Sequence, residues 1–395
     1  MMNESPWPKR LYALDATRGI AALSVVFWHW QHFAFEGDIL PQGFDRAVQP
    51  FYPFAKMLYE KGLLGVDYFF LLSGFIFFWI YKDAIGRRKT SFKEFWVHRL
   101  SRLYPLHLVT LCLVALLQAI YVARNIKPFV FEHNDTYHFL LHLGFASNWG
   151  FEKGWSFNTP VWSVSIEILL YFIFFLIVYR KLGHPFICLY ISLISFAVII
   201  FDPAHHLLVN GLLMFFLGGF VFYVTRLIST KYQNLRFAVY LVAATAWLVA
   251  IVNFYFFDFA DQVAVSPFMG YVIGNIFPYY VLFPFTVAGI ALIEINRGQF
   301  LKSISWLGDI TYSSYLLHFP LQILFALAVS YGILRADFYL QSGYLVLFFL
   351  ILVPLSYITF IAFERPMQKL LRKKFAARKQ STPLPGNSKS TQSII

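Results

Sequence analysis

The sequence predicts an all-α membrane protein: a polytopic bundle of about ten transmembrane helices, with both termini on the cytoplasmic side. Its composition is the first reason, because 59% of its 395 residues are hydrophobic and only 13% are charged. In a soluble domain about 25% of the residues are charged. The second reason is a series of long apolar segments, and the third is the placement of lysine and arginine between them.

A transmembrane helix needs about 20 mainly apolar residues. The chain contains ten segments that approach this length, at about 11–33, 62–81, 103–122, 160–179, 186–201, 207–225, 237–257, 270–293, 306–331 and 340–363. The segment at 186–201 is short and flanked by prolines, so its ends are the hardest to place. We therefore expect ten spans.

Lysine and arginine gather in every second loop, and this bias sets the expected orientation. Basic stretches at 82–102, at 226–236 and after Arg365 alternate with loops richer in Asp and Glu, such as 36–45. This pattern predicts a multi-pass protein of the inner (plasma) membrane with both termini in the cytoplasm. The net charge of +12 fits a basic cytoplasmic face. No basic stretch outside the spans alternates with aromatic residues, so we expect no nucleic-acid partner.

We divide the chain into a transmembrane domain at 1–374 and a cytoplasmic tail at 375–395. The tail is polar and contains Pro, Gly and Ser, a composition that predicts disorder. The longest outer loop, at about 123–159, is rich in aromatic residues and is expected to fold back over the bundle. Both cysteines lie within apolar segments, and we expect neither a disulfide nor a metal site.

The first apolar segment carries an arginine and a histidine, Arg18 and His29. Eleven residues bring a helix almost back to the same face and advance it by roughly 16 Å. The two side chains are therefore expected on one stripe, with Arg18 toward the cytoplasm. Ionisable groups at such depths are costly and favour a functional site inside the bundle. The alternative is an Arg18 paired with Asp15, together with a polar histidine near the interface.

Two further arginines, Arg99 and Arg102, are three residues apart and would share a helix face. With Arg18 they form a cationic inner layer that suits a phosphate-bearing ligand, because guanidinium groups bind phosphate bidentately. On spacing alone, Arg99 and Arg102 are equally well explained as anchors that snorkel to the cytoplasmic interface.

An outer layer of polar residues lies near the other ends of the helices: His29, Asp67, Trp162, Ser163 and Glu167, with His318 near the middle of the ninth span. A carboxylate within a span is hard to explain by packing, so we expect Glu167 to orient or charge His29. A structural pair with a cation or hydroxyl is the alternative. Ser163 has no glycine-flanked elbow, and a helix hydroxyl satisfied by a backbone carbonyl explains it better than a nucleophile does.

Six segments in this order resemble the acyltransferase family 3 integral membrane proteins. They are LDATRGIAALSVVFWH at 14–29, GVDYFFLLSGF at 65–75, HRLSRLYP at 98–105, PVWSVSIE at 160–167, LGDITYSSYLLHFP at 307–320 and FERP at 363–366. The resemblance covers about residues 10–370. It implies a ten-helix bundle that takes an acyl group, usually acetyl, from a coenzyme A thioester on the cytoplasmic side. The acceptor would be a hydroxyl of a carbohydrate or glycolipid.

The resemblance also implies roles for individual residues. The first-helix Arg and His of the family fall on Arg18 and His29, and its paired arginines fall on Arg99 and Arg102. Its Ser-x-x-x-Glu stretch matches Ser163 and Glu167. Acetyl-CoA or another acyl-CoA is then a donor substrate, and no permanently bound cofactor is expected.

The resulting hypothesis is an O-acyltransferase in which three arginines hold the coenzyme A phosphates: Arg18, Arg99 and Arg102. His29, poised by Glu167, deprotonates the acceptor hydroxyl. The substrate would be lined by Asp67, Trp162, Ser163 and His318. A two-step route through an acyl-enzyme remains open. The alternatives are a proton-coupled secondary transporter of an anionic metabolite or lipid-linked sugar and, more weakly, a structural scaffold.

Overall fold

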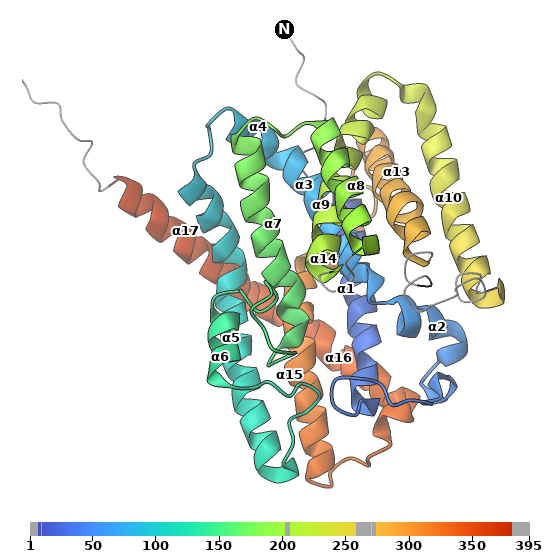
Figure 1. Cartoon of the computed structure of the whole chain (residues 1–395), viewed down its shortest axis with the longest axis vertical. Coiled ribbons are helices and arrows are strands. Elements are labelled where there is room, and N and C mark those ends of the chain that lie inside the picture. Colours follow the sequence, from blue (N-terminus) through green and yellow to red (C-terminus); the bar gives the residue numbers. More distant parts are fainter. Residues whose placement is uncertain (1–6, 9, 202–205, 258–269, 271–273, 381–395) are drawn as a thin grey trace, which may run out of the picture.

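The computed structural model describes residues 7–8, 10–201, 206–257, 270 and 274–380. These residues form helices and loops, and no strand occurs among them. The helices are α1 (Tyr12–Trp28), α2 (Tyr52–Lys61), α3 (Leu64–Ile80), α4 (Lys82–Gly86), α5 (Phe92–Asn125), α6 (Thr136–Leu143), α7 (Trp162–Tyr179), α8 (Pro185–Phe201), α9 (His206–Thr230), α10 (Arg236–Val252), α13 (Phe283–Arg297), α14 (Trp306–Asp309), α15 (Thr311–Ser330), α16 (Ser342–Thr359) and α17 (Arg365–Gln380). The long helices run side by side along the long axis of the molecule (Figure 1).

Within the described ranges, seven helical segments are long and apolar enough to cross a membrane: Phe92–Asn125, Thr159–Tyr179, Leu207–Thr230, Gln233–Phe257, Gly274–Arg297, Thr311–Ser330 and Ser342–Ala376. The bent pair α2 and α3, with 57° between them, makes an eighth if it counts as one broken span. The apolar helices α1 and α8 have 17 residues each. The expected count of ten is therefore not confirmed, although the expected segments are helical wherever they are described.

Glycines allow the central helices to approach each other closely. A Cβ atom on Gly74 of α3 would lie 1.8 Å from the Phe215 carbonyl oxygen of α9, and one on Gly218 of α9 would lie 1.9 Å from the Leu71 carbonyl oxygen. Both distances are far below van der Waals contact, so only glycine permits this crossing.

A second close approach places α1 against the short helix α14. A Cβ atom on Gly19 would lie 2.4 Å from Cβ of Leu307, and one on Gly308 would lie 2.4 Å from the Asp15 carbonyl oxygen. At the start of α1, the backbone N–H groups of Tyr12 and Ala13 donate to the buried carboxylate of Glu294, at 2.7 and 2.8 Å. These donors have no partner within the helix. The position of Arg18, within α1, is therefore held from two sides.

The outer loop between α5 and α7 folds back over the bundle, as expected. Phe129 and Phe131 of this loop pack against Phe319 of α15 in one apolar cluster. Near its end, the side-chain amide of Asn158 donates to the Leu316 carbonyl oxygen at 3.1 Å. The loop therefore covers the middle part of α15.

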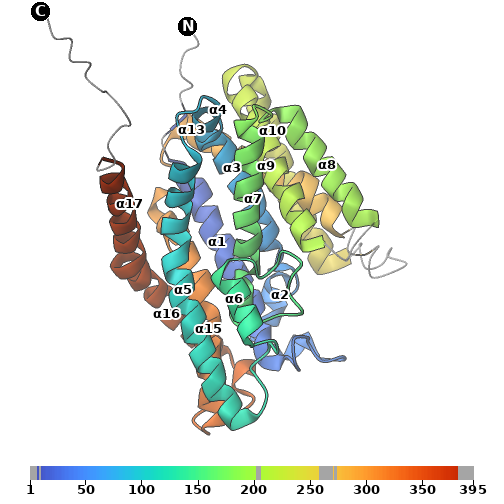
Figure 2. The ribbon, with the colours of Figure 1, turned by 60° about the vertical axis from the view of Figure 1, so that its left-hand side comes forward.

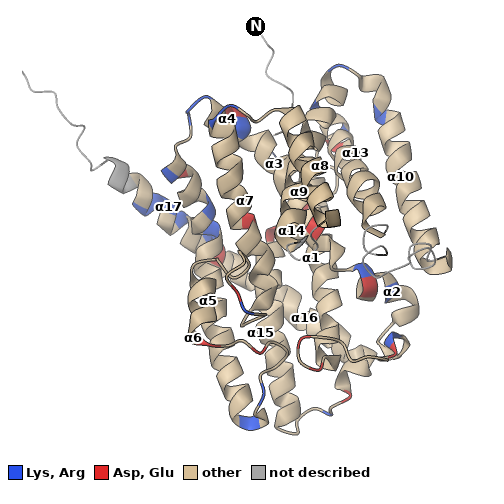
Figure 3. Cartoon of the chain, viewed as in Figure 1, with Lys and Arg blue, Asp and Glu red and all other residues tan. Residues whose placement is uncertain are grey.

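The last described helix, α17, is strongly basic and runs beside the first half of α5 (Figure 2). Arg372 holds it there by donating to Ser101 Oγ at 3.1 Å and to the His98 carbonyl oxygen at 3.2 Å. The basic α17 and the basic region around α4 lie toward the same end of the molecule (Figure 3). The helix continues through Gln380, so the expectation of disorder from 375 onward is wrong for 375–380. The rest of that expected tail, 381–395, lies outside the described residues, and the proposed domain boundary stays a prediction.

Candidate functional site

Two adjacent cavities share lining residues from α1, α3 and α5. We call the larger one the entry cavity; its volume is about 360 Å³, and Arg10, Asp309, Glu364 and Arg372 are among its lining residues. The deep cavity has a volume of about 140 Å³ and is lined by Ser163, Glu167 and Tyr315 among others. Both cavities are lined by Arg18, Ile76, Arg99 and Arg102. The three predicted arginines therefore lie together where the two cavities adjoin.

Arg18 is partly neutralised by its neighbours. Its Nη2 atom lies 3.1 Å from Asp15 Oδ1 and donates to the Gly308 carbonyl oxygen at 2.7 Å. Asp15 also accepts from Arg10 at 2.6 Å, and Arg10 reaches Asp309 at 3.0 Å. The alternative of an Asp15–Arg18 pair is thus confirmed, while Arg18 still borders both cavities.

The other cations of the entry cavity are less well compensated. Arg99 donates to the Tyr81 hydroxyl and lies over the rings of Phe77 and Tyr81, at 5.2 and 5.0 Å from their centroids. Arg102 makes no hydrogen bond with any described residue and no ion pair within 4 Å of one. The nearby carboxylate of Glu364 is bonded by the Ser313 hydroxyl. Arg102 is therefore available to an anionic ligand.

The far part of the deep cavity is polar. On α7, Ser163 and Glu167 are one helical turn apart and both line it. Ser163 Oγ lies 2.9 Å from the hydroxyl of Tyr315, and Glu167 Oε1 accepts from Ser73 Oγ at 2.8 Å. Tyr171 also interacts with the Glu167 carboxylate. The expected contact between Glu167 and His29 is not present among the described residues, because Glu167 faces the cavity. The fold instead contains the alternative arrangement, in which Glu167 forms a structural pair with hydroxyl groups.

His29 lies in what we call the histidine cluster: His29, His32 and His318. The α1 helix ends at Trp28, and His29 begins a 3₁₀ turn that extends to Ala34. The His29 ring lies 4.7 Å from that of His32 and stacks on that of His318 at 4.8 Å, measured between centroids. His29 is 5% exposed and His318 is fully buried. These imidazoles line neither cavity.

Gln322 organises the histidine cluster from α15. Its Nε2 atom donates to the His29 carbonyl oxygen at 2.6 Å, and its Oε1 atom lies 3.1 Å from His32 Nδ1. Within the described chain, His29 Nδ1 and both ring nitrogens of His318 have no hydrogen-bond partner. His32 and Gln322 were not anticipated from the sequence, although His32 follows His29 by one 3₁₀ turn.

Three of the four predicted substrate-binding residues, Asp67, Trp162 and His318, lie outside both cavities. Asp67 accepts from the Tyr279 hydroxyl at 3.0 Å. Trp162 packs edge-on against Phe70, with ring centroids 6.3 Å apart. The contacts of both side chains are those of helix packing, whereas Ser163 faces the deep cavity and His318 lies one turn beyond it.

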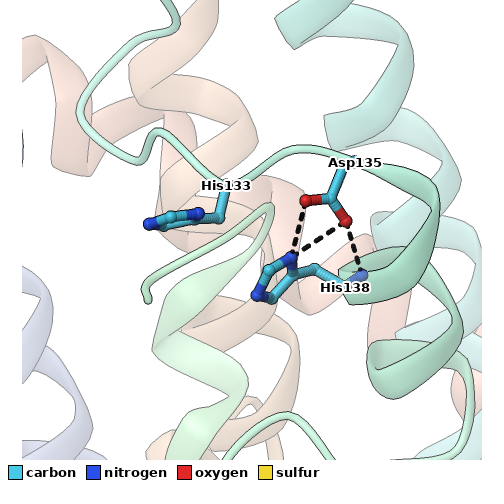
Figure 4. Close-up of side chains that lie close together, drawn as sticks. All are labelled: His133, Asp135 and His138. Carbon is cyan, nitrogen blue, oxygen red and sulfur yellow. Dashed lines mark hydrogen bonds and ion pairs between the residues drawn. The ribbon is translucent and has the colours of Figure 1, made fainter. Parts of the chain in front are cut away.

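A group of potential metal ligands occurs in the outer loop: His133, Asp135 and His138, with donor atoms within 4.8 Å of one another (Figure 4). However, both ring nitrogens of His138 are already used. Its Nδ1 atom bonds to Asp135 at 2.9 Å, and its Nε2 atom accepts from the Lys153 backbone N–H at 3.1 Å. If a metal bound at Nδ1, the ring proton would move to Nε2 and face that N–H group.

Asp135 is instead the N-cap of α6, where its carboxylate accepts from the His138 backbone N–H at 2.9 Å. This bond and the bond to the His138 ring hold the pKa of the Asp135 carboxyl below its ordinary value. The His133–Asp135–His138 group is therefore a helix cap with a fixed histidine tautomer.

The fold and site together describe a multi-pass membrane protein with a basic cavity beside a smaller, mainly apolar cavity that contains a few polar groups. The family model described as an acyltransferase domain matches residues 11–362. The chain therefore belongs to the acyltransferase 3 family.

Two curated relatives are similar over shorter segments. Acyltransferase MdmB of Streptomyces mycarofaciens is 30% identical over 167 residues, which are 42% of this chain and 38% of that protein. Protein 2 in picA locus of Rhizobium radiobacter is 33% identical over 114 residues, which are 29% of this chain and 48% of that protein. The chain thus spans less than half of either relative. No solved structure is significantly similar to this chain.

Proposed function

We propose that this protein is an O-acyltransferase of the inner (plasma) membrane. It transfers an acyl group, most simply acetyl, from cytoplasmic acyl-CoA to a hydroxyl of a carbohydrate or glycolipid. The observation that carries this proposal is the junction of the two cavities, where Arg18, Arg99 and Arg102 border both. Family membership supports an acyltransferase over a transporter or a scaffold.

The entry cavity suits the nucleotide end of the donor. Coenzyme A carries several phosphate groups, and arginine binds phosphate with paired, charge-assisted hydrogen bonds. Arg102 makes no hydrogen bond to a described residue that it would have to give up. Arg365 and Arg372 from α17 add positive charge to the same cavity.

The deep cavity suits the thioester end. One water molecule occupies about 30 Å³ of liquid, so a volume of about 140 Å³ admits a slender arm with a small acyl group. Apolar side chains such as Val66, Phe70 and Leu103 line it. This size supports acetyl over a long acyl chain.

His29 is the proposed general base, a role worth about 10²–10⁴ in rate. It is buried, and its Nδ1 atom is free of protein partners among the described residues. Among the described residues, no histidine makes a hydrogen bond with Ser163; its hydroxyl contacts Tyr315 and the Pro160 carbonyl oxygen. A serine nucleophile needs such a base, so the contacts favour direct transfer over an acyl-serine intermediate.

The test is thiol release from acetyl-CoA by purified protein in detergent, with and without an extract of envelope glycans. If the protein is an acyltransferase, thiol release should depend on the extract. If it is a transporter, no thiol should be released. In the Arg102→Ala variant we expect KM for acetyl-CoA to rise about 10- to 100-fold, from the loss of hydrogen bonds to a charged group worth about 1.5–3 kcal/mol.

Arg335→Ala is the matched control, since Arg335 is exposed and pairs only with Asp337. It should leave KM unchanged. An Arg102→Ala enzyme with the wild-type KM would contradict the proposed donor site.

A further inference from the structure

The deep cavity ends at two hydroxyl groups. Along α15 its lining residues are Thr311, Tyr312 and Tyr315, and His318 one turn later no longer lines it. Along α7, which runs in the opposite direction, the lining begins at Ser163 and continues through Glu167 to Tyr171. Ser163 and Tyr315 are therefore the lining residues of these two helices that lie farthest from the arginines.

The other hydroxyl groups that line the deep cavity are committed to protein acceptors. Tyr312 donates to the Leu103 carbonyl oxygen at 2.6 Å, and Thr311 donates to the Leu307 carbonyl oxygen at 3.2 Å. Ser73 and Tyr171 are both engaged by the Glu167 carboxylate, as described above. Among the hydroxyl groups of the described residues that line the deep cavity, only the Ser163–Tyr315 pair is left to offer a proton to a ligand at its far end.

The two hydroxyls of this pair carry two protons, and one of them joins the oxygens at 2.9 Å. The only other acceptor near Ser163 Oγ is the Pro160 carbonyl oxygen at 3.4 Å, beyond the usual range for an O–H···O bond. Either hydroxyl could be the donor of the 2.9 Å bond, and we take the arrangement in which Ser163 donates to Tyr315. The phenol proton of Tyr315 is then free, and because its oxygen accepts a hydrogen bond, it is a stronger donor.

We propose that Tyr315 donates a hydrogen bond to the carbonyl oxygen of the bound thioester and stabilises the oxyanion formed there during transfer. Ser163 is the positioning residue that orients the phenol. This assignment rests on the proposed function, and it adds a catalytic residue that sequence reasoning did not identify. The signal in the sequence that could have identified Tyr315 is its position three residues before His318.

Bonds, electron pairs and protons balance in the proposed acyl transfer. The acceptor oxygen forms a bond to the thioester carbonyl carbon, and its proton passes to His29. The carbonyl π electrons move to the oxygen that faces Tyr315. When the C=O bond re-forms, the C–S bond breaks, and the coenzyme A thiolate takes up the proton that the acceptor lost. Ester and free thiol are the products.

The experiment compares wild-type protein with Tyr315→Phe, both bound to acetyl-CoA carrying ¹³C at the carbonyl. Isotope-edited infrared spectroscopy reads the hydrogen bond to that carbonyl directly and needs no acceptor. We expect the wild-type carbonyl band to lie at lower frequency than in Tyr315→Phe, with similar dissociation constants for acetyl-CoA. Thiol release to the glycan extract should fall about 10²–10³-fold in kcat.

Tyr68→Phe is the matched control. The Tyr68 hydroxyl donates to Thr17 Oγ1 at 2.8 Å, a bond of the same kind outside both cavities, so its loss reports the structural cost alone. It should leave the carbonyl band and kcat at wild-type values. Ser163→Ala should broaden the carbonyl band and reduce kcat less than Tyr315→Phe.

The outcomes separate the two proposals. If wild-type protein binds no acetyl-CoA, the proposed function fails, and this inference with it. If acetyl-CoA binds and the carbonyl band of Tyr315→Phe equals that of the wild type, only the role of Tyr315 is overturned. Equal losses of kcat in Tyr315→Phe and Tyr68→Phe would also overturn it.

Discussion

The imidazole rings of His29 and His318 stack 4.8 Å apart at an angle of 30°, one from the end of α1 and one from the middle of α15. His318 in turn lies 5.8 Å from the ring of Tyr315, measured between centroids. These contacts connect the histidine cluster to the end of the deep cavity. The proposed base and the proposed donor pocket are thus neighbours through α15, although His29 does not line the cavity.

Replacement of His29 should separate catalysis from donor binding. In His29→Ala we expect kcat for glycan-dependent thiol release to fall about 10²–10⁴-fold, the contribution of a general base. The dissociation constant of acetyl-CoA should stay within about twofold of wild type, because His29 lies outside both cavities. His133→Ala, a histidine of the outer loop, is the control. Normal turnover in folded His29→Ala would remove His29 from the mechanism.

The α3–α9 crossing should not tolerate a methyl group. In Gly74→Ala the new Cβ atom meets the Phe215 carbonyl oxygen, so the helices must separate. We expect a loss of stability of about 1–3 kcal/mol, as in other overpacked cores, seen as a lower Tm in detergent. Gly86→Ala in α4 is the comparison, since nothing lies within 4 Å of its Cβ position. Equal Tm values for the two variants would show that the crossing is looser than described.

The N-cap of α6 should depend on the carboxyl oxygen of Asp135. Asp135→Ala removes the acceptor of the His138 backbone N–H and should cost about 0.5–2 kcal/mol locally. Faster hydrogen exchange in α6 measures this loss. Asp135→Asn keeps an acceptor at the cap position and should retain most of the protection. Unchanged exchange in Asp135→Ala would mean that the outer loop is held elsewhere.

The same cap predicts a pH dependence. The folded-state pKa of Asp135 lies below the ordinary value of 3.8, because its hydrogen bonds favour the charged form. The contribution of the ionised Asp135 carboxylate to the stability of α6 is therefore complete above about pH 3.8. This contribution is lost as the pH falls through the lower, folded-state pKa. We expect the protection of α6, corrected for the intrinsic exchange rate, to be constant from neutral pH to about pH 4. A decline that begins near pH 6 would contradict this assignment.

Arg372 should hold α17 against α5. In Arg372→Ala the bonds to Ser101 and to the His98 carbonyl oxygen are lost, so α17 should become more sensitive to limited trypsin digestion. KM for acetyl-CoA should also rise, because the entry cavity loses one cation. Lys373→Ala, an exposed neighbour, serves as the control. Equal digestion of both variants would indicate that other contacts fix the helix.

Much of this arrangement could be predicted from the sequence, because it follows from properties of single helices. Apolar length predicted which segments are helical, and a spacing of four residues correctly placed Ser163 and Glu167 on one face of α7. The depth of Arg18, Arg99 and Arg102 correctly predicted that they lie together.

What could not be predicted depends on how the helices face one another. Glu167 and His29 were expected to meet because they lie at similar depths, but depth does not determine the direction in which a side chain points. Glu167 faces Ser73 across the cavity, while His29 faces α15. The contacts of Asp67 with Tyr279, and of Gln322 with two histidines, likewise arise between helices far apart in the sequence.

The outer loop also bears on the electrical properties of the membrane. The lining of the deep cavity extends from the arginines to Ser163 and Tyr315. On the other side, the ring of Phe131 packs on His32 and on Phe319. We expect this apolar layer to block ions and protons, so that a membrane containing the protein keeps its electrochemical gradient while the basic cavity stays open.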